Sequence, residues 1–189
     1  VYMPISKADD PFAPMTKWGR KRATVFTGFC DYHDTELFKP IENYDFNFSE
    51  EHIFLYIYRA FALEFHKKQE AVQMQRRMFR KLPSLINNRN SPIHDLLGGF
   101  EAAVDDLAKE KEIFDDSIMN KKYNSLISIV WEFEKEIKFA ASGFEALCYD
   151  LEGIQIQDIS DLERKAKHVF FTIFPENQKS YFHHNSRSV

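Results

Sequence analysis

The sequence has very little cysteine and no long apolar run. Its 189 residues include only two cysteines, Cys30 and Cys148, which excludes a secreted cysteine framework and allows one disulfide at most. No apolar run approaches the ~20 residues that a membrane-spanning helix needs. The N-terminus also lacks the basic region and apolar run of a signal peptide. We therefore expect a cytoplasmic protein with two reduced thiols and no membrane partner.

The sequence also has no large excess of charge of one sign, and it lacks the common catalytic motifs. The formal net charge at pH 7 is -4, so the composition gives no general argument for binding nucleic acid or a membrane surface. The P-loop, G-x-G-x-x-G, G-x-S-x-G and H-E-x-x-H motifs are missing, which excludes the usual nucleotide-binding, hydrolase and metalloprotease patterns. Hydrophobic residues make up 44% of the chain, and Phe occurs 19 times. A sizeable buried core is therefore expected.

The residue patterns predict helices in the first two-thirds of the chain and strands in the last third. Ser49 is a good N-cap followed by Glu50 and Glu51, and apolar residues at i, i+3 and i+4 steps predict a long central helix that Pro83 ends. A second long helix is expected over 93–118. Segregated elements of this kind indicate an α+β fold with an antiparallel sheet in the C-terminal third.

Several strand signals lie in that last third. Residues 126–139 alternate in part, with Ile129, Trp131 and Phe133 set against glutamates, which is the two-residue period of a strand with one solvent-exposed face. The sequence around Glu152–Gly153 predicts a turn with a short strand on either side. Residues 169–184 predict a hairpin.

A change of pattern within residues 23–42 carries the best candidate for a metal site. β-Branched and aromatic residues give way to a helical pattern that Pro40 ends, and the change falls on Cys30-x-x-His33. A thiolate and an imidazole at this spacing can share one tetrahedral ion, commonly Zn²⁺, but a full site needs four ligands. The alternative is a buried free cysteine beside a surface histidine. The missing ligands would be residues before Val1, another chain, or His52, His66 or Asp34.

Two further candidate sites depend on charge. Asp34, near Glu36 at a helix start, is a candidate catalytic ligand for Mg²⁺ or Mn²⁺, although both carboxylates would also complement the helix dipole. A basic cluster further along is a candidate for nucleic-acid contacts, and a solvated helix end is the alternative. The cluster consists of Arg76, Arg77, Arg80 and Lys81.

Two charged residues in the central helix and two neighbouring histidines are expected to have structural roles. Arg59 and Glu64 interrupt the apolar half of the central helix and need partners if buried, such as Lys68 for Glu64. His183 and His184 are neighbours on a predicted strand and point to opposite faces, so they are not expected to share an ion.

The segment T-V-F-T-G-F-C-D-Y-H-D-T-E-L-F-K-P-I-E resembles a stretch from a group of uncharacterised bacterial proteins. The 150–158 turn and the F-T-I-F-P-E hairpin resemble that group's C-terminal half, and the group's N-terminal part is similar to the treble-clef, ββα-metal arrangement of HNH endonucleases. The resemblance implies that Cys30 and His33 form the second half of a zinc knuckle. The first half, with the histidine that activates water, would then precede Val1. An Asp at position 34 departs from the Asn or His that HNH-like proteins often have there, which leaves catalysis open.

These patterns predict a zinc-knuckle-like strand and helix over 1–48, joined in one compact unit to a helical and sheet body over 49–189. Two functions remain open. One is a nucleic-acid-directed, HNH-like protein or degenerate nuclease, with structural Zn²⁺ completed by upstream ligands and with Mg²⁺ or Mn²⁺ if it is catalytic. The other is a non-enzymatic interaction or scaffold module, which predicts a broad apolar patch. The sequence leaves the oligomeric state undetermined.

Overall fold

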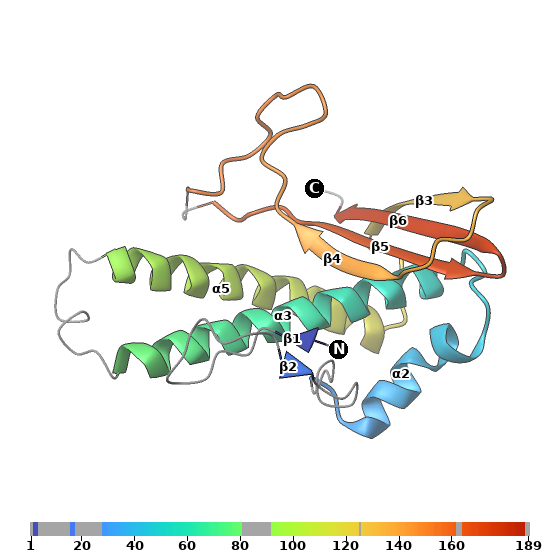
Figure 1. Cartoon of the computed structure of the whole chain (residues 1–189), viewed down its shortest axis with the longest axis horizontal. Coiled ribbons are helices and arrows are strands. Elements are labelled where there is room, and N and C mark those ends of the chain that lie inside the picture. The colour runs from blue at the N-terminus through green and yellow to red at the C-terminus, as the bar shows by residue number, and fades with distance from the viewer. Residues whose placement is uncertain are drawn as a thin grey trace.

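A computed structural model describes residues 2–3, 16–17, 28–80, 92–124, 126–161 and 164–187. Within these ranges the chain forms a layer of helices beneath a four-stranded antiparallel sheet (Figure 1). The helices come first and the sheet lies in the C-terminal third, so the predicted α+β class is confirmed. No helix in the described part is long and apolar enough to cross a membrane.

Three helices make up the helical layer: α2 (Asp31–Asn43), α3 (Glu50–Arg80) and α5 (Pro92–Met119). The side chain of Ser49 accepts a hydrogen bond of 3.3 Å from the backbone N–H of His52, which confirms Ser49 as the N-cap of α3. Helix α2 runs through Pro40 and ends less than one turn beyond it. This is as expected for a residue that lacks an N–H and clashes with the preceding turn.

Helix α3 is the centre of the core, as its wide apolar face predicts. It packs against α2, α5 and the sheet, and Phe61 lies 4.7 Å from Phe114 of α5, measured between ring centroids. Its partner in the sheet is Phe170, at 6.0 Å from the ring of Phe61. The most deeply buried apolar residues of α3 are Phe54, Leu55, Ile57, Tyr58, Ala60 and Phe61.

The sheet consists of β3 (Leu126–Phe133), β4 (Ala141–Glu145), β5 (Val169–Glu176) and β6 (Lys179–Arg187). Their order is β3-β6-β5-β4, so β3 and β4 are the two edge strands. The predicted hairpin is confirmed as β5 and β6, whose turn has positive φ angles of 52° at Asn177 and 65° at Gln178. A separate pair, β1 (Tyr2–Met3) and β2 (Thr16–Lys17), is also antiparallel.

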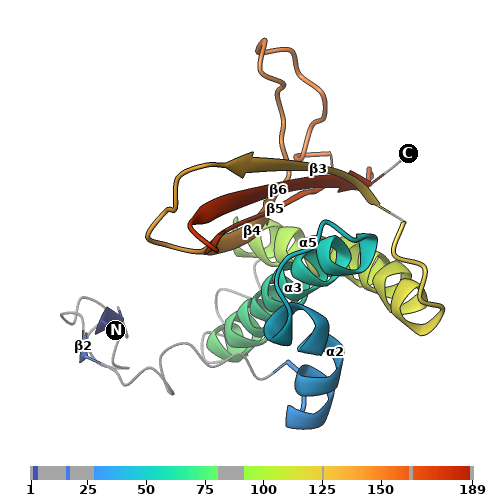
Figure 2. The same cartoon turned by 90° about the vertical axis from the view of Figure 1, so that its right-hand side faces the viewer.

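One face of the sheet, called the inner face here, lies on the helices, and the other, the outer face, is directed away from them (Figure 2). On the inner face β5 and β6 bury Phe170, Thr172, Phe174, Tyr181 and His183. The register places the alternate residues of each strand on the outer face.

The face of β3 that the structure exposes corrects the sequence interpretation. The apolar set that includes Ile129, Trp131 and Phe133 lies on the outer face, and each of these side chains is 44% to 48% exposed. The prediction of a single solvent-exposed face, formed by the glutamates, is therefore wrong, because the apolar face of this strand is exposed as well. The strand also ends at Phe133, and residues 134–139 belong to the connection to β4.

Other predictions fall partly or wholly outside the described residues. Residues 23–27 of the predicted first strand are outside them, and Gly28 and Phe29 form a bend. The predicted stop at Pro83 and the loop over 87–91 also lie outside them.

Arg59 and Glu64, which interrupt the apolar half of α3, are not buried charges paired across the core. Arg59 is exposed and makes an ion pair of 2.7 Å with Glu42 of α2. Glu64 pairs with Lys67 at 2.6 Å, one residue short of the predicted partner, because i and i+3 neighbours also share a helix face.

Candidate functional site

Cys30 and His33 lie side by side at the start of α2. The Sγ atom of Cys30 is 3.1 Å from Nδ1 of His33, and both side chains are exposed. The contact follows from local structure, because Cys30 precedes α2 and residues three apart share a face of a helix. Thiolate and imidazole are the ligand types that Zn²⁺ prefers, but the pair supplies two of the four ligands that a structural site needs.

The other predicted metal ligands do not converge on this pair. His52 is buried against Phe46 with ring centroids 6.3 Å apart, and His66 lies 3.5 Å from Glu70 on the same helix. Among the described residues, no group of three or more His, Cys, Asp or Glu side chains is placed to hold an ion. The part of the chain that the structure describes therefore does not complete a zinc site.

Asp34 occupies the first turn of α2, one turn after Cys30. Its backbone N–H donates to the carbonyl of Cys30 at 2.9 Å, and Asp31 is the other acidic residue of this turn. Negative charge at this position complements the helix dipole, which accounts for Asp34 without a catalytic role. Glu36 is exposed on the same helix.

The basic cluster at the end of α3 is partly occupied by an ion pair. Arg76 donates from Nε and Nη2 to one carboxylate oxygen of Glu101 in α5, at 3.0 and 2.6 Å, so this guanidinium connects two helices. Arg77 and Arg80 are exposed in the last turn, where cations complement the helix dipole. Lys81 lies outside the described residues.

A cavity of about 490 Å³ lies between α3, α5 and the segment that leads to β5. Its charged side chains have both signs, and two pairs of them lie close together: Arg164 is 3.2 Å from Asp161, and Lys109 is 3.9 Å from Asp106. His168 also lines it, and burial lowers the pKa of this imidazole. The described lining therefore offers no concentrated charge of one sign to an ionic ligand.

His183 lies on the inner face of β6, enclosed by aromatic rings. Its ring centroid is 4.6 Å from that of Phe46, 5.3 Å from that of Phe174 and 5.7 Å from that of Tyr56. Neither ring nitrogen has a hydrogen-bond partner among the described residues. Burial lowers the pKa of His183 to about 4, so the imidazole is neutral at physiological pH. His184 belongs to the opposite face, as strand alternation predicts.

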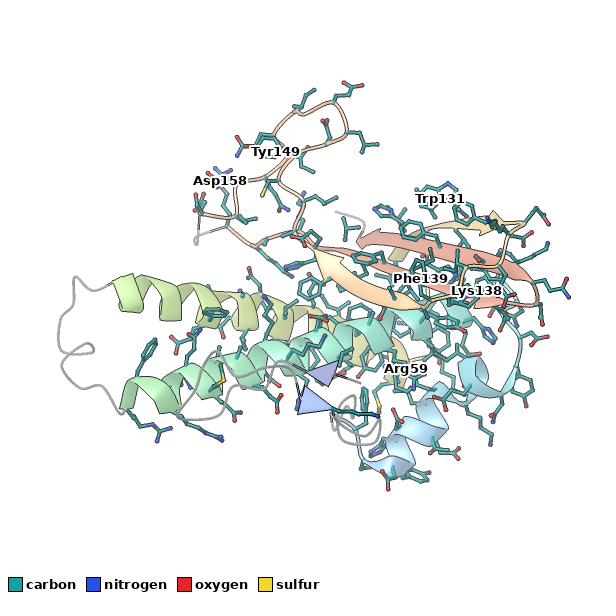
Figure 3. All side chains as sticks on the ribbon, viewed as in Figure 1. Arg59, Trp131, Lys138, Phe139, Tyr149 and Asp158 are labelled. Atoms are coloured by element: carbon teal, nitrogen blue, oxygen red, sulfur yellow. The ribbon has the colours of Figure 1, made fainter. Side chains whose placement is uncertain are left out.

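The outer face is an apolar surface with almost no charge. Trp131 stacks on Phe182 of the neighbouring strand with ring centroids 5.3 Å apart, and Figure 3 shows Trp131 on the side of the sheet away from the helices. At the outward positions of 127–133, 141–145, 169–173 and 180–184, Glu145 is the only residue with a formal charge. The four outward side chains of β3 are between 44% and 54% exposed: Ile127, Ile129, Trp131 and Phe133.

A projecting segment over 146–159, called the arm here, rises from the same side of the sheet (Figures 1 and 3). Gln157 closes its base, because its side-chain amide donates to the carbonyls of Leu147 and Lys167 at 2.7 and 3.0 Å. Asp150 shapes its tip by accepting from the backbone N–H groups of residues 152 and 154. The predicted turn is present, with φ of 82° at Gly153, but the short strands expected on either side are reduced to one bridge between Tyr149 and Gln155. The arm therefore has a defined conformation.

The arm exposes large apolar side chains although its backbone is ordered by hydrogen bonds. Leu151 at the tip is fully exposed, and each of the others is at least 41% exposed. Monomeric proteins rarely display contiguous apolar patches of more than a few hundred Å², and the arm and the outer face lie on the same side of the sheet. The remaining exposed side chains of the arm are Leu147, Tyr149, Ile154, Ile156 and Ile159.

The sequence interpretation missed this surface, although the signal was present as the alternation of apolar residues from 127 to 133. No family model, curated protein or solved structure matches the chain.

Proposed function

We propose that this chain is a non-enzymatic interaction module that binds another polypeptide through the outer face and the arm. The observation that carries the proposal is the row of four half-exposed apolar side chains on β3, together with an arm that carries six more on the same side of the sheet. Interface centres are poor in charged residues and rich in aromatic ones. The outer face has this composition, with Trp131 stacked on Phe182.

The chemistry of the outer face favours a polypeptide over a nucleic acid. Aromatic rings on a sheet can stack on bases, but strands of nucleic acid also need a cationic groove for their phosphates. The described outward positions of the sheet carry no lysine or arginine, and the nearby arm adds Asp150, Glu152 and Asp158. The acidic arm would repel phosphates. The connection over 134–139, which hydrogen-bonds Ser180 at the far end of the face, adds two exposed lysines but also two exposed glutamates, so it provides no excess of positive charge.

Photo-crosslinking in cells that make the protein tests this proposal. A photoreactive amino acid replaces Trp131 in one variant and Met74, which is exposed on α3, in the control. We expect a discrete polypeptide adduct from position 131 that mass spectrometry identifies and that Ile129→Lys abolishes. No such adduct, an adduct with nucleic acid, or equal adducts from both positions would refute the proposal.

We also propose a second candidate, an HNH-like, nucleic-acid-directed zinc protein. It is supported by the 3.1 Å contact between Cys30 Sγ and His33 Nδ1, a pair of the ligand types that zinc prefers. Two further zinc ligands would come from outside the described residues, Asp34 would bind Mg²⁺ or Mn²⁺, and Arg77 and Arg80 would face phosphates. We propose a cytoplasmic location for both candidates, since two cysteines far apart in the sequence fit the low cysteine use of cytosolic proteins.

Elemental analysis distinguishes this second candidate from the first. The protein is prepared with its native upstream residues and compared with a Cys30→Ala, His33→Ala double variant. About one zinc per chain, lost in the double variant, would support the zinc knuckle and justify a nuclease assay with Mg²⁺ or Mn²⁺. Absence of zinc from the native protein would refute it.

A further inference from the structure

The apolar row of β3 and the arm are placed at opposite edges of one sheet. β3, which carries the exposed apolar row, is one edge strand, and β4, which leads into the arm, is the other. Both features also lie at the same end of the sheet: Val169 of β5 pairs with Glu145 on one side and with Ser186 on the other, and Ser186 pairs in turn with Ile127. The arm therefore leaves the sheet level with the start of β3.

We propose that the polypeptide that covers this surface is a second copy of the chain, an inference that rests on the interaction function proposed above. The two outer faces pack against each other around a two-fold axis parallel to the strands. Such an axis reverses the strand order across the interface, so that each β3 lies opposite the β4 edge of the other copy. Each arm then packs its apolar side chains against Ile127 and Ile129 of the other copy.

This arrangement satisfies the requirement that an isologous interface be self-complementary. The chain carries both halves of the contact, an exposed apolar strand at one edge and an ordered apolar arm at the other. A two-fold pair therefore covers both features in both copies at once. Two sheets that pack face to face interdigitate their side chains in a layer about 10 Å thick.

The available area fits a stable dimer. The four outward side chains of β3 are about half exposed, and the arm adds six more that are 41% exposed or greater. An extended chain exposes about 1.45 Å² per dalton, which is about 160 Å² for Ile or Leu and more for an aromatic residue, so these residues together expose roughly 1,000 Å² per copy. A standard stable interface needs about 800 Å² per partner.

The charge distribution allows two copies to meet. Glu145 is the only charged residue among the described outward strand positions, so the centre of the interface would contain little like charge. The connection over 134–139, which hydrogen-bonds Ser180 at one end of the outer face, has two exposed lysines and two exposed glutamates and so adds no net charge of one sign. The acidic residues of the two arms would lie at opposite edges of the pair, roughly 15 Å or more apart across a four-stranded sheet. This separation exceeds the Debye length of about 8 Å at physiological salt, so their repulsion is screened.

Analytical ultracentrifugation tests the dimer directly. We expect the full chain to sediment with twice its monomer mass of 22.4 kDa as its concentration rises from about 1 to 100 µM. Ile129→Lys in β3 and Leu151→Lys in the arm should each raise the dimer Kd by ~30-fold or more, because a symmetric interface contains each substitution twice. Both side chains are exposed, so the monomer should still fold, which circular dichroism checks. Met74→Lys, exposed on α3, is the matched control and should leave the Kd unchanged.

A crosslinking experiment checks the predicted contact. A photoreactive amino acid at position 151 is used in a mixture of isotopically light and heavy chains, and we expect light–heavy peptide pairs that join the arm to residues 127–133. A monomer at the highest concentration, or a dimer that withstands both Ile129→Lys and Leu151→Lys, would overturn the inference. The protein could also be a monomer in which position 131 still crosslinks to a different, identified polypeptide. This result would refute a second copy as the partner and leave the proposed function standing. A monomer without any such adduct would overturn both.

Discussion

Acid should destabilise this protein through His183. The side chain is fully buried among aromatic rings, and its ring nitrogens have no hydrogen-bond partner among the described residues. Burial lowers its pKa to about 4, from an ordinary value of 6.5, because a charged imidazole would lose its hydration in this environment. In the unfolded chain the same imidazole titrates near its ordinary value.

The sign and size of the effect follow from these two pKa values. His183 binds a proton below pH 6.5 in the unfolded state, but only below about pH 4 in the folded state. The free energy of unfolding therefore falls as the pH falls from 6.5 to 4. One pKa unit corresponds to about 1.4 kcal/mol. The loss between pH 7.5 and pH 5 is therefore about 2 kcal/mol, and about 3 kcal/mol when the pH reaches 4. The lowered pKa of His168 adds a loss of the same sign.

Two substitutions separate titration from the burial of a polar group. His183→Leu removes both the titratable group and the buried nitrogens at a similar side-chain volume, whereas His183→Gln removes the titration and keeps buried polar atoms. In the wild type the free energy of unfolding falls between pH 7.5 and pH 5. We expect this fall to be about 2 kcal/mol smaller in both variants. At pH 7.5 the Leu variant should be more stable than the Gln variant, because an unpaired buried polar group is unfavourable.

Urea unfolding followed by circular dichroism measures these free energies at pH 7.5, 6.5 and 5. One protein concentration is used throughout, since association shifts apparent stability. If wild-type stability stays constant from pH 7.5 to 5, or if both variants keep the wild-type pH dependence, the reasoning about His183 is wrong.

Three further predictions concern contacts that hold the fold together, each measured by urea unfolding at neutral pH. Ser49→Ala removes the N-cap of α3 and should lower the free energy of unfolding by about 1 kcal/mol; no change would mean that the cap is idle. Ser180→Ala removes a fully buried hydroxyl that donates to the carbonyl of Lys135 at 2.8 Å. It should lower the free energy of unfolding by about 1–3 kcal/mol, and Ser180→Thr, which keeps a hydroxyl, should recover part of the loss. A double-mutant cycle of Arg59→Ala and Glu42→Ala should give a coupling of only about 0.5 kcal/mol, because both side chains of this 2.7 Å pair are exposed; a coupling above ~2 kcal/mol would contradict this.

The sequence by itself determined the elements whose signals are local. Apolar residues at helical spacing and the cap at Ser49 fix where α3 begins, and the strand pattern over 169–184 gives the hairpin of β5 and β6. The contact between Cys30 and His33 is local in the same sense, because residues three apart at a helix start are neighbours. These features depend on backbone geometry within a few residues, so their prediction needs no knowledge of the rest of the chain.

Only the tertiary structure decided which face of β3 is buried and which predicted ligands meet. Alternation along a strand defines two faces but does not say which of them another layer covers. Helices α3 and α5 cover the inner face alone, where Phe170 of β5 packs on them, and the apolar row of β3 remains on the outer face. The ion pair between Arg76 and Glu101 and the separation of His52 from Cys30 are likewise set by how distant elements pack, because side chains far apart in sequence meet only when the fold brings their elements together.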